Sequence, residues 1–207
     1  GSFYHGGAGT DTFYADWSGW TEAVVWENNP SQAVTINGVT ISGMERLLIA
    51  TGSGDDVITN VAATNDYFEL GAGNDSFVGG SGTDTVYAGA GDDVIDVGRG
   101  TAWIDGGTGV DTLTVDLSDV TSSLYTSFYA EDGSTIAFLT QSASFVQVHD
   151  ALLNAVSFRI TNGTDIRYQN VERVNVTAGS GHDLVINQGG SFYHGGAGTD
   201  TFYADWS

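Results

Sequence analysis

Aspartates that closely follow glycines recur every nine residues through the middle of the chain, and their carboxylates are the side-chain groups best suited to binding a cation. From Thr51 the sequence divides into the nonads TGSGDDVIT, VAATNDYFE, LGAGNDSFV, GGSGTDTVY, AGAGDDVID, VGRGTAWID and GGTGVDTLT, with only Asn60 outside the frame. Further copies are GGAGTDTFY at 6–14 and 195–203, and AGSGHDLVI at 178–186. Carboxylate and carbonyl oxygens are ligands of hard divalent cations, so this pattern predicts a series of cation sites.

The candidate ligands occupy fixed places in the nonad. The sixth position supplies the carboxylates Asp11, Asp56, Asp66, Asp75, Asp84, Asp93, Asp111, Asp183 and Asp200. The second and fourth positions supply glycines, which permit positive φ in a tight turn. These are Gly52, Gly54, Gly71, Gly73, Gly89, Gly91, Gly107, Gly109, Gly179, Gly181, Gly196 and Gly198. Ordinary surface turns are the competing interpretation, but 11 of the 20 aspartates fall in positions five and six after glycines, which favours a ligand set.

The eighth position of the nonad predicts the secondary structure. It is apolar in all ten copies: Phe13, Ile58, Phe68, Phe77, Val86, Ile95, Ile104, Leu113, Val185 and Phe202. The seventh and ninth positions are mixed, so one inward side chain lies between two outward ones, as in a strand of three residues. A helix would need apolar residues three and four apart, which a period of nine does not supply.

Two such strands and two turns make one coil of 18 residues, because each nonad holds one strand and one turn. Successive coils should stack at the spacing of neighbouring strands, about 4.8 Å. The predicted fold is therefore all-β: a right-handed parallel β-roll, interrupted by two inserts rich in β-hairpins.

These nonads resemble the calcium-binding repeats of the RTX (repeats-in-toxin) family, and the resemblance covers about half of the chain directly. It implies calcium ions between turns stacked on the same edge, held by the sixth-position Asp and by loop carbonyls. It also implies export through a type I channel in the unfolded state, with folding outside the cell. The blocks in which DTLTVDLS leads into an insert, followed by ERLLIATGSGDD, look like the RTX units of giant bacterial surface proteins.

Calcium is expected to decide whether the chain folds. One buried apolar side chain per nonad gains little against ~1–2 kcal/mol of backbone entropy per residue, and facing turns bring like charges together. With a Kd of roughly 10⁻⁴–10⁻³ M, ~10 mM calcium adds roughly 1.4–2.7 kcal/mol per site. Four strong sites would supply about 5–11 kcal/mol, which is comparable with the whole stability of a domain.

Alternate turns share an edge of such a roll, and the sequence predicts that the two edges differ. One edge carries the intact loops GSGDD, GAGND, GAGDD and GTGVD, and should hold three ions between four aspartates. These are Asp56, Asp75, Asp93 and Asp111. The other edge carries AATND, GSGTD and GRGTA, in which glycines are missing from the first loop and Ala102 replaces Asp in the third. It should hold one or two weak sites, around Asp84 and Asp66.

The remaining aspartates lie outside this central run. Asp183 and Asp200 bracket a degenerate turn, NQGGSFYH, so they should share an edge and bind one more ion, which brings the strong sites to about four. Asp11 has no turn before it in this sequence, and we expect its loop to be empty or loosely ordered.

An exact repeat indicates the organisation of the chain. Residues 1–18, GSFYHGGAGTDTFYADWS, recur unchanged at 190–207. A cloning overlap would produce this, but we expect a tandem array with a unit of 189 residues, excerpted from a longer protein. The predicted parts are the end of a preceding unit (1–18), a hairpin insert (19–44), the main β-roll (45–114), a larger β insert (115–171) and a second roll block running into the next unit (172–207).

A weaker echo lies inside the unit. GGAGTDTFYADWS at 6–18 resembles GGTGVDTLTVDLS at 106–118, and ERLLIATGSGDDVI at 45–58 resembles ERVNVTAGSGHDLV at 172–185. Each unit should therefore contain two blocks of the same plan, separated by unlike inserts.

The inserts carry three hairpin signals and one weak helix signal. The dipeptides Asn37–Gly38, Asp132–Gly133 and Asn162–Gly163 each join two arms of strand type. The segment HDALLNA at 149–155 is the one candidate for a short helix. Three tryptophans, Trp17, Trp20 and Trp26, could form a sugar-stacking platform, although aromatics that cover strand faces are the simpler interpretation.

The composition excludes several classes of partner. The net charge is −21, with 26 acidic residues against 5 basic ones, so nucleic acid and anionic lipid would be repelled. No run of about 18 apolar residues is present, which argues against membrane insertion. The absence of cysteine excludes disulfides and thiolate sites, and the four histidines show no zinc spacing. No catalytic constellation stands out, so we do not expect an enzyme.

The expected function is that of a calcium-rigidified extender repeat in a very large secreted bacterial surface protein, which would hold a distal adhesive region away from the cell. The expected partners are calcium, neighbouring copies of the repeat and cell-surface or polysaccharide ligands. Two alternatives remain open: a self-associating subunit of a surface layer, sheath or filament, and a polysaccharide-binding module attached to an enzyme.

Overall fold

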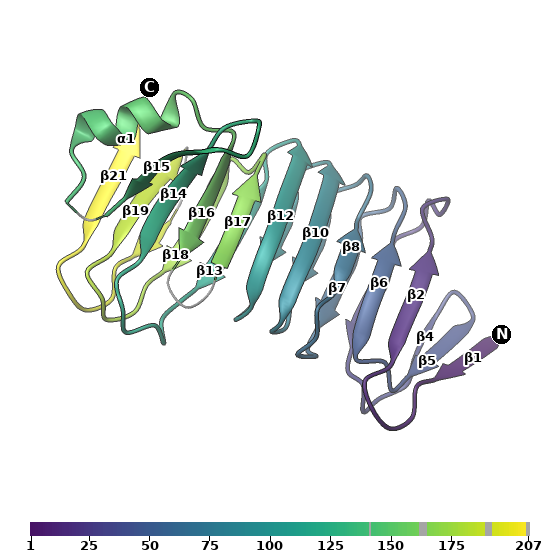
Figure 1. Cartoon of the computed structure of the whole chain (residues 1–207). Helices are drawn as coiled ribbons and strands as arrows, with labels where there is room; N and C mark the ends of the chain where they lie inside the picture. Colours follow the sequence, from purple (N-terminus) through teal and green to yellow (C-terminus); the bar gives the residue numbers. More distant parts are fainter. Residues whose placement is uncertain (141, 162–164, 189–191, 206–207) are drawn as a thin grey trace.

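The computed structural model describes residues 1–140, 142–161, 165–188 and 192–205, which consist almost entirely of strands and turns. Strands alternate along the chain between two mainly parallel sheets, so that successive coils lie side by side from one end of the molecule to the other (Figure 1). The parallel strands of the first sheet are β2 (Thr12–Asp16), β6 (Arg46–Ala50), β8 (Tyr67–Glu69), β10 (Thr83–Ala90), β12 (Thr101–Thr108) and β17 (Asp165–Gln169). Those of the second sheet are β3 (Val25–Asn28), β7 (Val57–Asn60), β9 (Ser76–Val78), β11 (Val94–Asp96), β13 (Thr112–Asp116), β18 (Arg173–Thr177) and β20 (Tyr193–His194).

Residues one coil apart are direct neighbours in these sheets. Val86 of β10 is paired with Ile104 of β12, and Ile95 of β11 is paired with Leu113 of β13. Each pair is separated by 18 residues, the length expected of two nonads.

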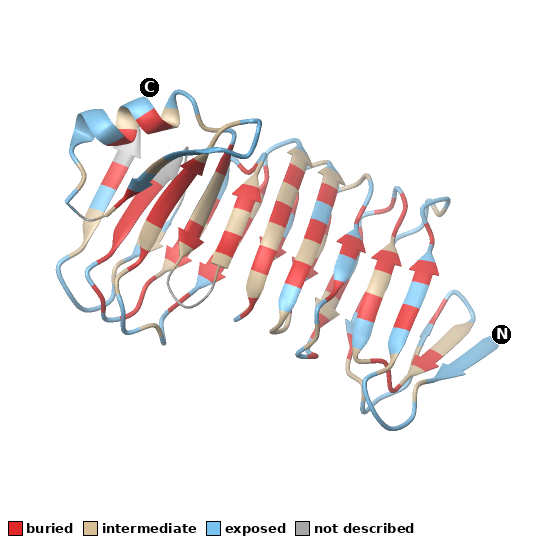
Figure 2. Cartoon of the chain, in the orientation of Figure 1, coloured by how far each residue is buried: buried red, intermediate tan, exposed pale blue. Residues whose placement is uncertain are grey.

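The eighth-position side chains form the core between the sheets, because a strand of period two turns its middle residue inward. Nine of the ten are at most 7% exposed: Phe13, Ile58, Phe68, Phe77, Val86, Ile95, Ile104, Leu113 and Val185. Buried and exposed residues alternate along the strands (Figure 2). The exception is Phe202, which is 46% exposed and lies in the last described strand.

Several nonad strands are longer than the three residues predicted, and β10 and β12 are the longest. β10 and β12 have eight residues each, because the pairing continues from the eighth-position residues into the following turns. Gly89 and Ala90 of one turn pair with Gly107 and Thr108 of the next. The turns therefore add backbone hydrogen bonds between coils, which a count of apolar side chains does not reveal.

The N-terminal insert contains the predicted hairpin. β4 (Val34–Ile36) and β5 (Val39–Ser42) pair antiparallel, and both turn residues have positive φ, 46° at Asn37 and 79° at Gly38. Such a turn follows the twist of the two strands it joins. The free side of β5 pairs in parallel with β1 (Ser2–His5).

The larger insert adds antiparallel strands to the first sheet. β14 (Tyr125–Tyr129) pairs with β15 (Thr135–Leu139) across the predicted Asp132–Gly133 turn, and it also pairs with β16 (Ser157–Thr161). The Asn162–Gly163 turn lies outside the described residues, but β16 and β17 pair antiparallel on either side of it. A separate pair of parallel strands follows, β19 (Leu184–Gln188) and β21 (Thr201–Asp205).

The helix prediction was right in kind and wrong in position. In place of 149–155, the helix α1 spans Phe145–Leu152, because Ser144 and Gln147 form a capping box that fixes an earlier start. Val148 and Ala151 of α1 are buried in a second apolar cluster that includes Leu184, Ile186 and Tyr203. Within the described residues, no helix has the length and apolar character needed to cross a membrane.

Candidate calcium sites on the edges of the sheets

Four sixth-position aspartates lie in a column on the edge where the chain passes from the first sheet to the second, here called the first edge. The Asp56 N–H donates to Asp75 Oδ1 over 2.7 Å, and the Asp75 N–H donates to Asp93 Oδ1 over 2.7 Å. The Asp93 N–H donates to Asp111 Oδ1 over 2.9 Å. One carboxylate oxygen of each coil thus binds the backbone of the coil before it, and the four residues form a continuous ladder.

A glutamate and a backbone N–H end this ladder, and neither belongs to the ligand set predicted from the nonads. At the start, the Val24 N–H donates to Asp56 Oδ1 over 2.6 Å. At the far end, the Asp111 N–H donates to Glu172 Oε2 over 2.8 Å. Glu172 lies outside the nonad frame, yet it has a signal in the sequence: it and Glu45 open the two echoed segments ERVNV and ERLLI.

The second oxygen of each ladder carboxylate is buried without a hydrogen-bond partner. This holds for Oδ2 of Asp56, Asp75, Asp93 and Asp111, whose residues are at most 2% exposed. An unsatisfied oxygen of a buried carboxylate costs at least about 1–3 kcal/mol. A cation between neighbouring coils would satisfy two such oxygens at once, so the donor set fits a hard divalent ion.

Burial makes three of these carboxylates, those of Asp75, Asp93 and Asp111, reluctant to ionise without a cation. Burial, together with the charges of Asp56 and Asp93, raises the pKa of Asp75 to about 7. Burial, with the charge of Asp93, raises the pKa of Asp111 to about 6, and burial also raises the pKa of Asp93. Both causes penalise negative charge, and a bound cation would relieve both.

Glycine columns bring the loop backbones together beside the carboxylates. Gly89 and Gly91 have φ of 113° and 136°, and a Cβ on either would overlap the carbonyl oxygen of Gly71 or Gly73 in the coil before. In the same way, Gly107 and Gly109 stack on Gly89 and Gly91 of the coil before. Gly71 and Gly73 stack on Gly52 and Gly54. Among the described residues, no three acidic or histidine side chains gather around one point. A bound ion would therefore need backbone carbonyls beside the two carboxylates, as the packed loops could supply.

Position five forms a second, outer ladder on the same edge. The Asn74 N–H donates to Asp55 Oδ1, the Asp92 N–H to Asn74 Oδ1 and the Val110 N–H to Asp92 Oδ1, over 2.8 to 2.9 Å. The neutral side chain of Asn74 accepts the same hydrogen bond as Asp55 and Asp92 do, so this ladder requires no negative charge and its role is to join the coils. In the sequence, aspartates at positions five and six both follow the glycines, so the nonad pattern alone does not separate the two roles.

On the opposite or second edge, Asp66 has little free ligand capacity. Its Oδ1 accepts from the Leu47 N–H over 2.6 Å, and its Oδ2 accepts from Asn60 Nδ2 over 2.7 Å. The Thr64 hydroxyl lies 3.1 to 3.2 Å from both oxygens. Burial raises the pKa of Asp66, but hydrogen bonds already satisfy its oxygens.

Asp84 is the other acidic side chain of the second edge. Its Oδ1 accepts from the Asp66 N–H over 3.0 Å, and burial, with the charge of Asp66, raises its pKa to about 6. Its neighbour in the following coil is Ala102, so no carboxylate faces it from that side. The second edge thus offers Asp84 one carboxylate neighbour, and that neighbour is already hydrogen-bonded.

The loop AATND lacks glycines because its neighbour differs. The glycines at positions two and four would direct a Cβ toward the preceding coil, as Gly80 and Gly82 do toward Ala62 and Thr64. For Thr64 itself, the preceding segment on this edge is the end of the hairpin insert, where its hydroxyl donates to Glu45 O over 2.6 Å. A side chain therefore fits where no nonad lies before it.

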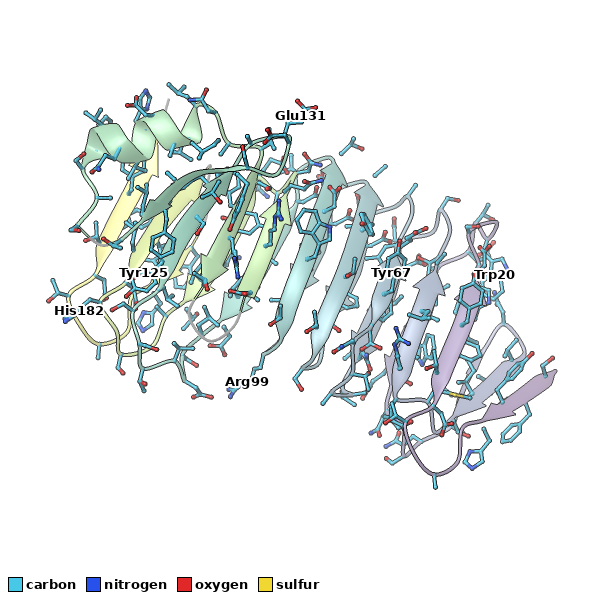
Figure 3. All side chains as sticks on the ribbon, in the orientation of Figure 1. Trp20, Tyr67, Arg99, Tyr125, Glu131 and His182 are labelled. Atoms are coloured by element: carbon cyan, nitrogen blue, oxygen red, sulfur yellow. The ribbon has the colours of Figure 1, made fainter. Side chains whose placement is uncertain are left out.

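Asp183 and Asp200 are joined on the second edge as well. The Asp183 N–H donates to Asp200 Oδ1 over 3.1 Å, and Asp183 Oδ2 is buried without a partner. Gly196 and Gly198 pack against the carbonyls of Gly179 and Gly181. His182 lies on the same edge as Arg99 (Figure 3), and its Nδ1 accepts from the Thr199 N–H over 2.8 Å.

Asp11 has a side-chain partner for its backbone N–H in the coil that follows. Its N–H donates to Glu45 Oε2 over 2.9 Å, which matches the bond from Asp111 to Glu172. Its Oδ2 is buried and has no hydrogen-bond partner. The two echoed blocks thus share one hydrogen-bond plan, as the bonds from Val24 to Asp56 and from Leu124 to Asp183 also indicate.

The tryptophans of the N-terminal insert form part of the packing. Trp17 and Trp26 are 8% and 1% exposed, and Trp20 stacks on Trp17 with ring centroids 4.8 Å apart. Two of the three rings are therefore closed to a sugar, which supports the simpler interpretation of these aromatics.

Stacked coils, orphaned carboxylate oxygens and packed glycine loops define a calcium-binding repeat protein. Residues 69–104 match the family model of the RTX calcium-binding nonapeptide repeat, over four copies, so the chain carries RTX repeats. These repeats bind Ca²⁺, are typical of secreted bacterial proteins and usually have structural roles. No curated protein and no solved structure matches the chain.

Proposed function

We propose that this chain is a calcium-folded structural repeat, an extender segment of a large secreted bacterial surface protein of the adhesin type. Its fold would be a right-handed parallel β-roll, stiffened by about four strongly bound calcium ions. Three would lie on the first edge, between Asp56, Asp75, Asp93 and Asp111, and one between Asp183 and Asp200. Asp84 would add weaker binding, whereas hydrogen bonds already satisfy the oxygens of Asp66.

The observation that carries the proposal is the column of buried, unpartnered Oδ2 atoms on the first edge. Without a cation, four carboxylates in successive coils oppose folding by desolvation and by mutual repulsion. Calcium supplies positive charge at these oxygens, and the same groups then favour the folded coil. A protein of this kind would stay unfolded in a calcium-poor cytoplasm and would fold after export.

Circular dichroism in EGTA and then in ~10 mM calcium tests this proposal. We expect β signal to appear cooperatively as millimolar calcium is added. Magnesium should substitute poorly, because it demands a smaller and more regular octahedron of ligands. A full β signal in EGTA, unchanged by calcium, would refute the proposal.

Two rival functions predict other results. A self-assembling subunit of a surface layer or sheath should form large particles in light scattering when calcium is added, whereas an extender should remain monodisperse. A polysaccharide-binding module should retain sugars on a glycan array, whereas an extender should retain none.

A further inference from the structure

One 18-residue sequence occurs twice in the chain, and the described part of the second copy, residues 192–205, lies in different surroundings from the first copy. Residues 1–18 and 190–207 are identical. In the first copy, β2 pairs with β6, the strand that follows it in the first sheet. In the second copy, β21 pairs with β19, the strand that precedes it. Among the described residues, each copy thus pairs through the edge of its strand that is unpaired in the other copy.

Burial of the aromatic side chains is reversed between the two copies. Phe13 is 7% exposed, whereas the equivalent Phe202 is 46% exposed. Tyr14 is 71% exposed, whereas the equivalent Tyr203 is 9% exposed. Each end of the molecule therefore exposes the aromatic ring that the same sequence buries at the other end.

Different neighbours cause this reversal. Phe13 points inward, where its ring lies 5.9 Å from that of Trp26 and 6.2 Å from that of Trp17. Tyr203 points outward, where its ring lies 5.2 Å from that of Phe145 on α1. Trp26 follows the repeated coil in sequence and α1 precedes it, so a coil flanked on both sides would bury both rings.

The glycines of the two copies differ in the same sense. A Cβ on Gly196 or Gly198 would overlap the carbonyl oxygen of Gly179 or Gly181, whereas a Cβ on Gly7 or Gly9 would meet no atom within 4 Å. In terms of space alone, glycines at positions 7 and 9 would therefore be needed only if a preceding coil packed against them, as one packs against Gly196 and Gly198.

The carboxylate ladder gives the same result. Asp183 donates its N–H to Asp200, and Asp11, the equivalent of Asp200, donates its N–H to Glu45. Joined through the shared residue, the two halves form one ladder with the plan of the first edge. The unpartnered Oδ2 atoms of Asp183 and Asp11 belong to neighbouring rungs of it.

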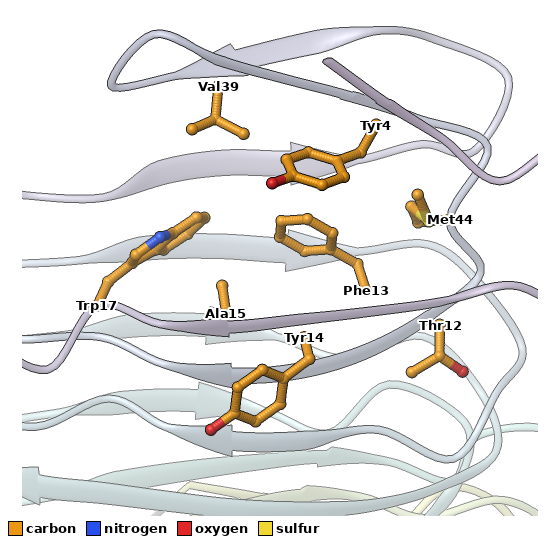
Figure 4. Close-up of a pocket in the computed structure, with 8 residues that line it drawn as sticks. All are labelled: Tyr4, Thr12, Phe13, Tyr14, Ala15, Trp17, Val39 and Met44. Atoms are coloured by element: carbon orange, nitrogen blue, oxygen red, sulfur yellow. The ribbon is translucent and has the colours of Figure 1, made fainter. Parts of the chain in front are cut away.

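A hollow of about 350 Å³ lies at the N-terminal coil, lined by Tyr4, Phe13, Ala15, Trp17, Val39 and Met44 among others (Figure 4). Val185 is the register partner of Phe202 at the other end. In a joined array, Val185 of the preceding copy would lie beside Phe13 of the next copy, at this hollow.

We propose that consecutive copies of this repeat share one coil: residues 190–207 of one copy are residues 1–18 of the next, paired on both edges at once. The partner of this surface is a second copy of the chain. The register follows from the structure: Val185 of one copy, the shared phenylalanine and Leu47 of the next copy are adjacent. This deepens the proposed function and rests on it, because a rigid rod needs unit boundaries without a flexible linker.

Thiol protection tests the shared coil, since the chain has no cysteine of its own. Phe202→Cys is made in the 207-residue chain and in a longer chain, in which a second copy of residues 19–207 follows Ser207. In calcium, alkylation of this thiol should be at least ~10-fold slower in the longer chain, because the second copy covers it. Phe13→Cys is the matched buried control and should be slow in both chains. Val25→Cys, at a site that is 66% exposed, should be fast in both.

Equal alkylation rates of Phe202→Cys in the two chains, with Phe13→Cys protected, would overturn the shared coil. If Phe13→Cys is itself reactive, loss of the ring has opened the coil, and thermal melts of the unaltered chains decide: the longer one must melt higher. Circular dichroism of the same samples in EGTA and in calcium separates the two proposals. Folding on calcium with equal rates rejects the shared coil alone, whereas no response to calcium in either chain rejects the proposed function.

Discussion

The substitution Asp75→Asn should stabilise the fold in the absence of calcium and destabilise it in the presence of calcium. The amide keeps an oxygen that can accept the Asp56 N–H, so the ladder bond of 2.7 Å can survive. The change removes one negative charge from a position between Asp56 and Asp93, whose charges help to raise the pKa of Asp75 to about 7. Without calcium, Asp75→Asn should therefore stabilise the fold.

In calcium, the same change should destabilise the fold by about 3–5 kcal/mol. Asp75 lies between two coils of the ladder, so its Oδ2 serves the proposed sites on both sides. At ~10 mM calcium and a Kd of roughly 10⁻⁴–10⁻³ M, each site contributes roughly 1.4–2.7 kcal/mol, and two adjoining sites are lost. Urea denaturation at several calcium concentrations measures this difference.

Asp66→Asn is the matched control on the other edge. Hydrogen bonds from the Leu47 N–H, Asn60 and Thr64 already satisfy both oxygens of Asp66, so its loss should cost about the same with and without calcium. The reasoning fails if Asp75→Asn leaves the calcium-dependent stabilisation intact, or if Asp66→Asn reduces it equally.

Two further predictions concern protons and glycine. Burial raises the pKa of Asp75 to about 7 and those of Asp84 and Asp111 to about 6, so the calcium-free fold binds protons more tightly than the unfolded chain. Its stability in EGTA should therefore rise as the pH falls from about 7.5 toward 4, measured as β signal in circular dichroism, while calcium affinity falls. Gly89→Ala should destabilise the calcium-bound fold by at least about 2 kcal/mol more than Gly9→Ala in thermal melts, because φ is similar (113° and 118°) and only Gly89 lies against a carbonyl. Equal melting of the two variants would count against packing of the coils through glycine.

Much of the fold could be predicted because the nonad determines both the length of a coil and the edge on which each loop lies. An apolar eighth position between two positions of mixed character predicts a strand of period two, and nine of the ten eighth-position side chains are buried. Two nonads per coil place alternate loops on one edge, where the structure joins Asp56, Asp75, Asp93 and Asp111 by hydrogen bonds. A local repeat contains this information because each coil contacts only its neighbours.

What could not be predicted depends on contacts between unlike segments. The antiparallel strands β14 and β16 join the first sheet through a long insert that has no period. The start of α1 depends on the pairing of Ser144 with Gln147, which a search for apolar spacing overlooks. Glu45 and Glu172 end their ladders as substitutes for Asp, and only the echo between the two blocks indicates their equivalence.

The candidate sites were predictable as residues but not as atoms. The sequence indicates which aspartates follow glycines. It does not indicate which carboxylate oxygen accepts a backbone N–H and which is left to bind a cation. The structure makes this division for Asp75, whose Oδ1 accepts a backbone N–H while Oδ2 is buried and unpartnered. It also separates the outer ladder of Asp55, Asn74 and Asp92 from the inner one.

The most direct test of calcium-dependent folding is a crystal structure of the chain grown in calcium, with anomalous scattering recorded from a lanthanide exchanged into the same crystals. We expect three peaks on the first edge, one between each consecutive pair of Asp56, Asp75, Asp93 and Asp111, each within ligand distance of the Oδ2 atoms that have no hydrogen-bond partner. Folded coils with no peak between these carboxylates would contradict the account.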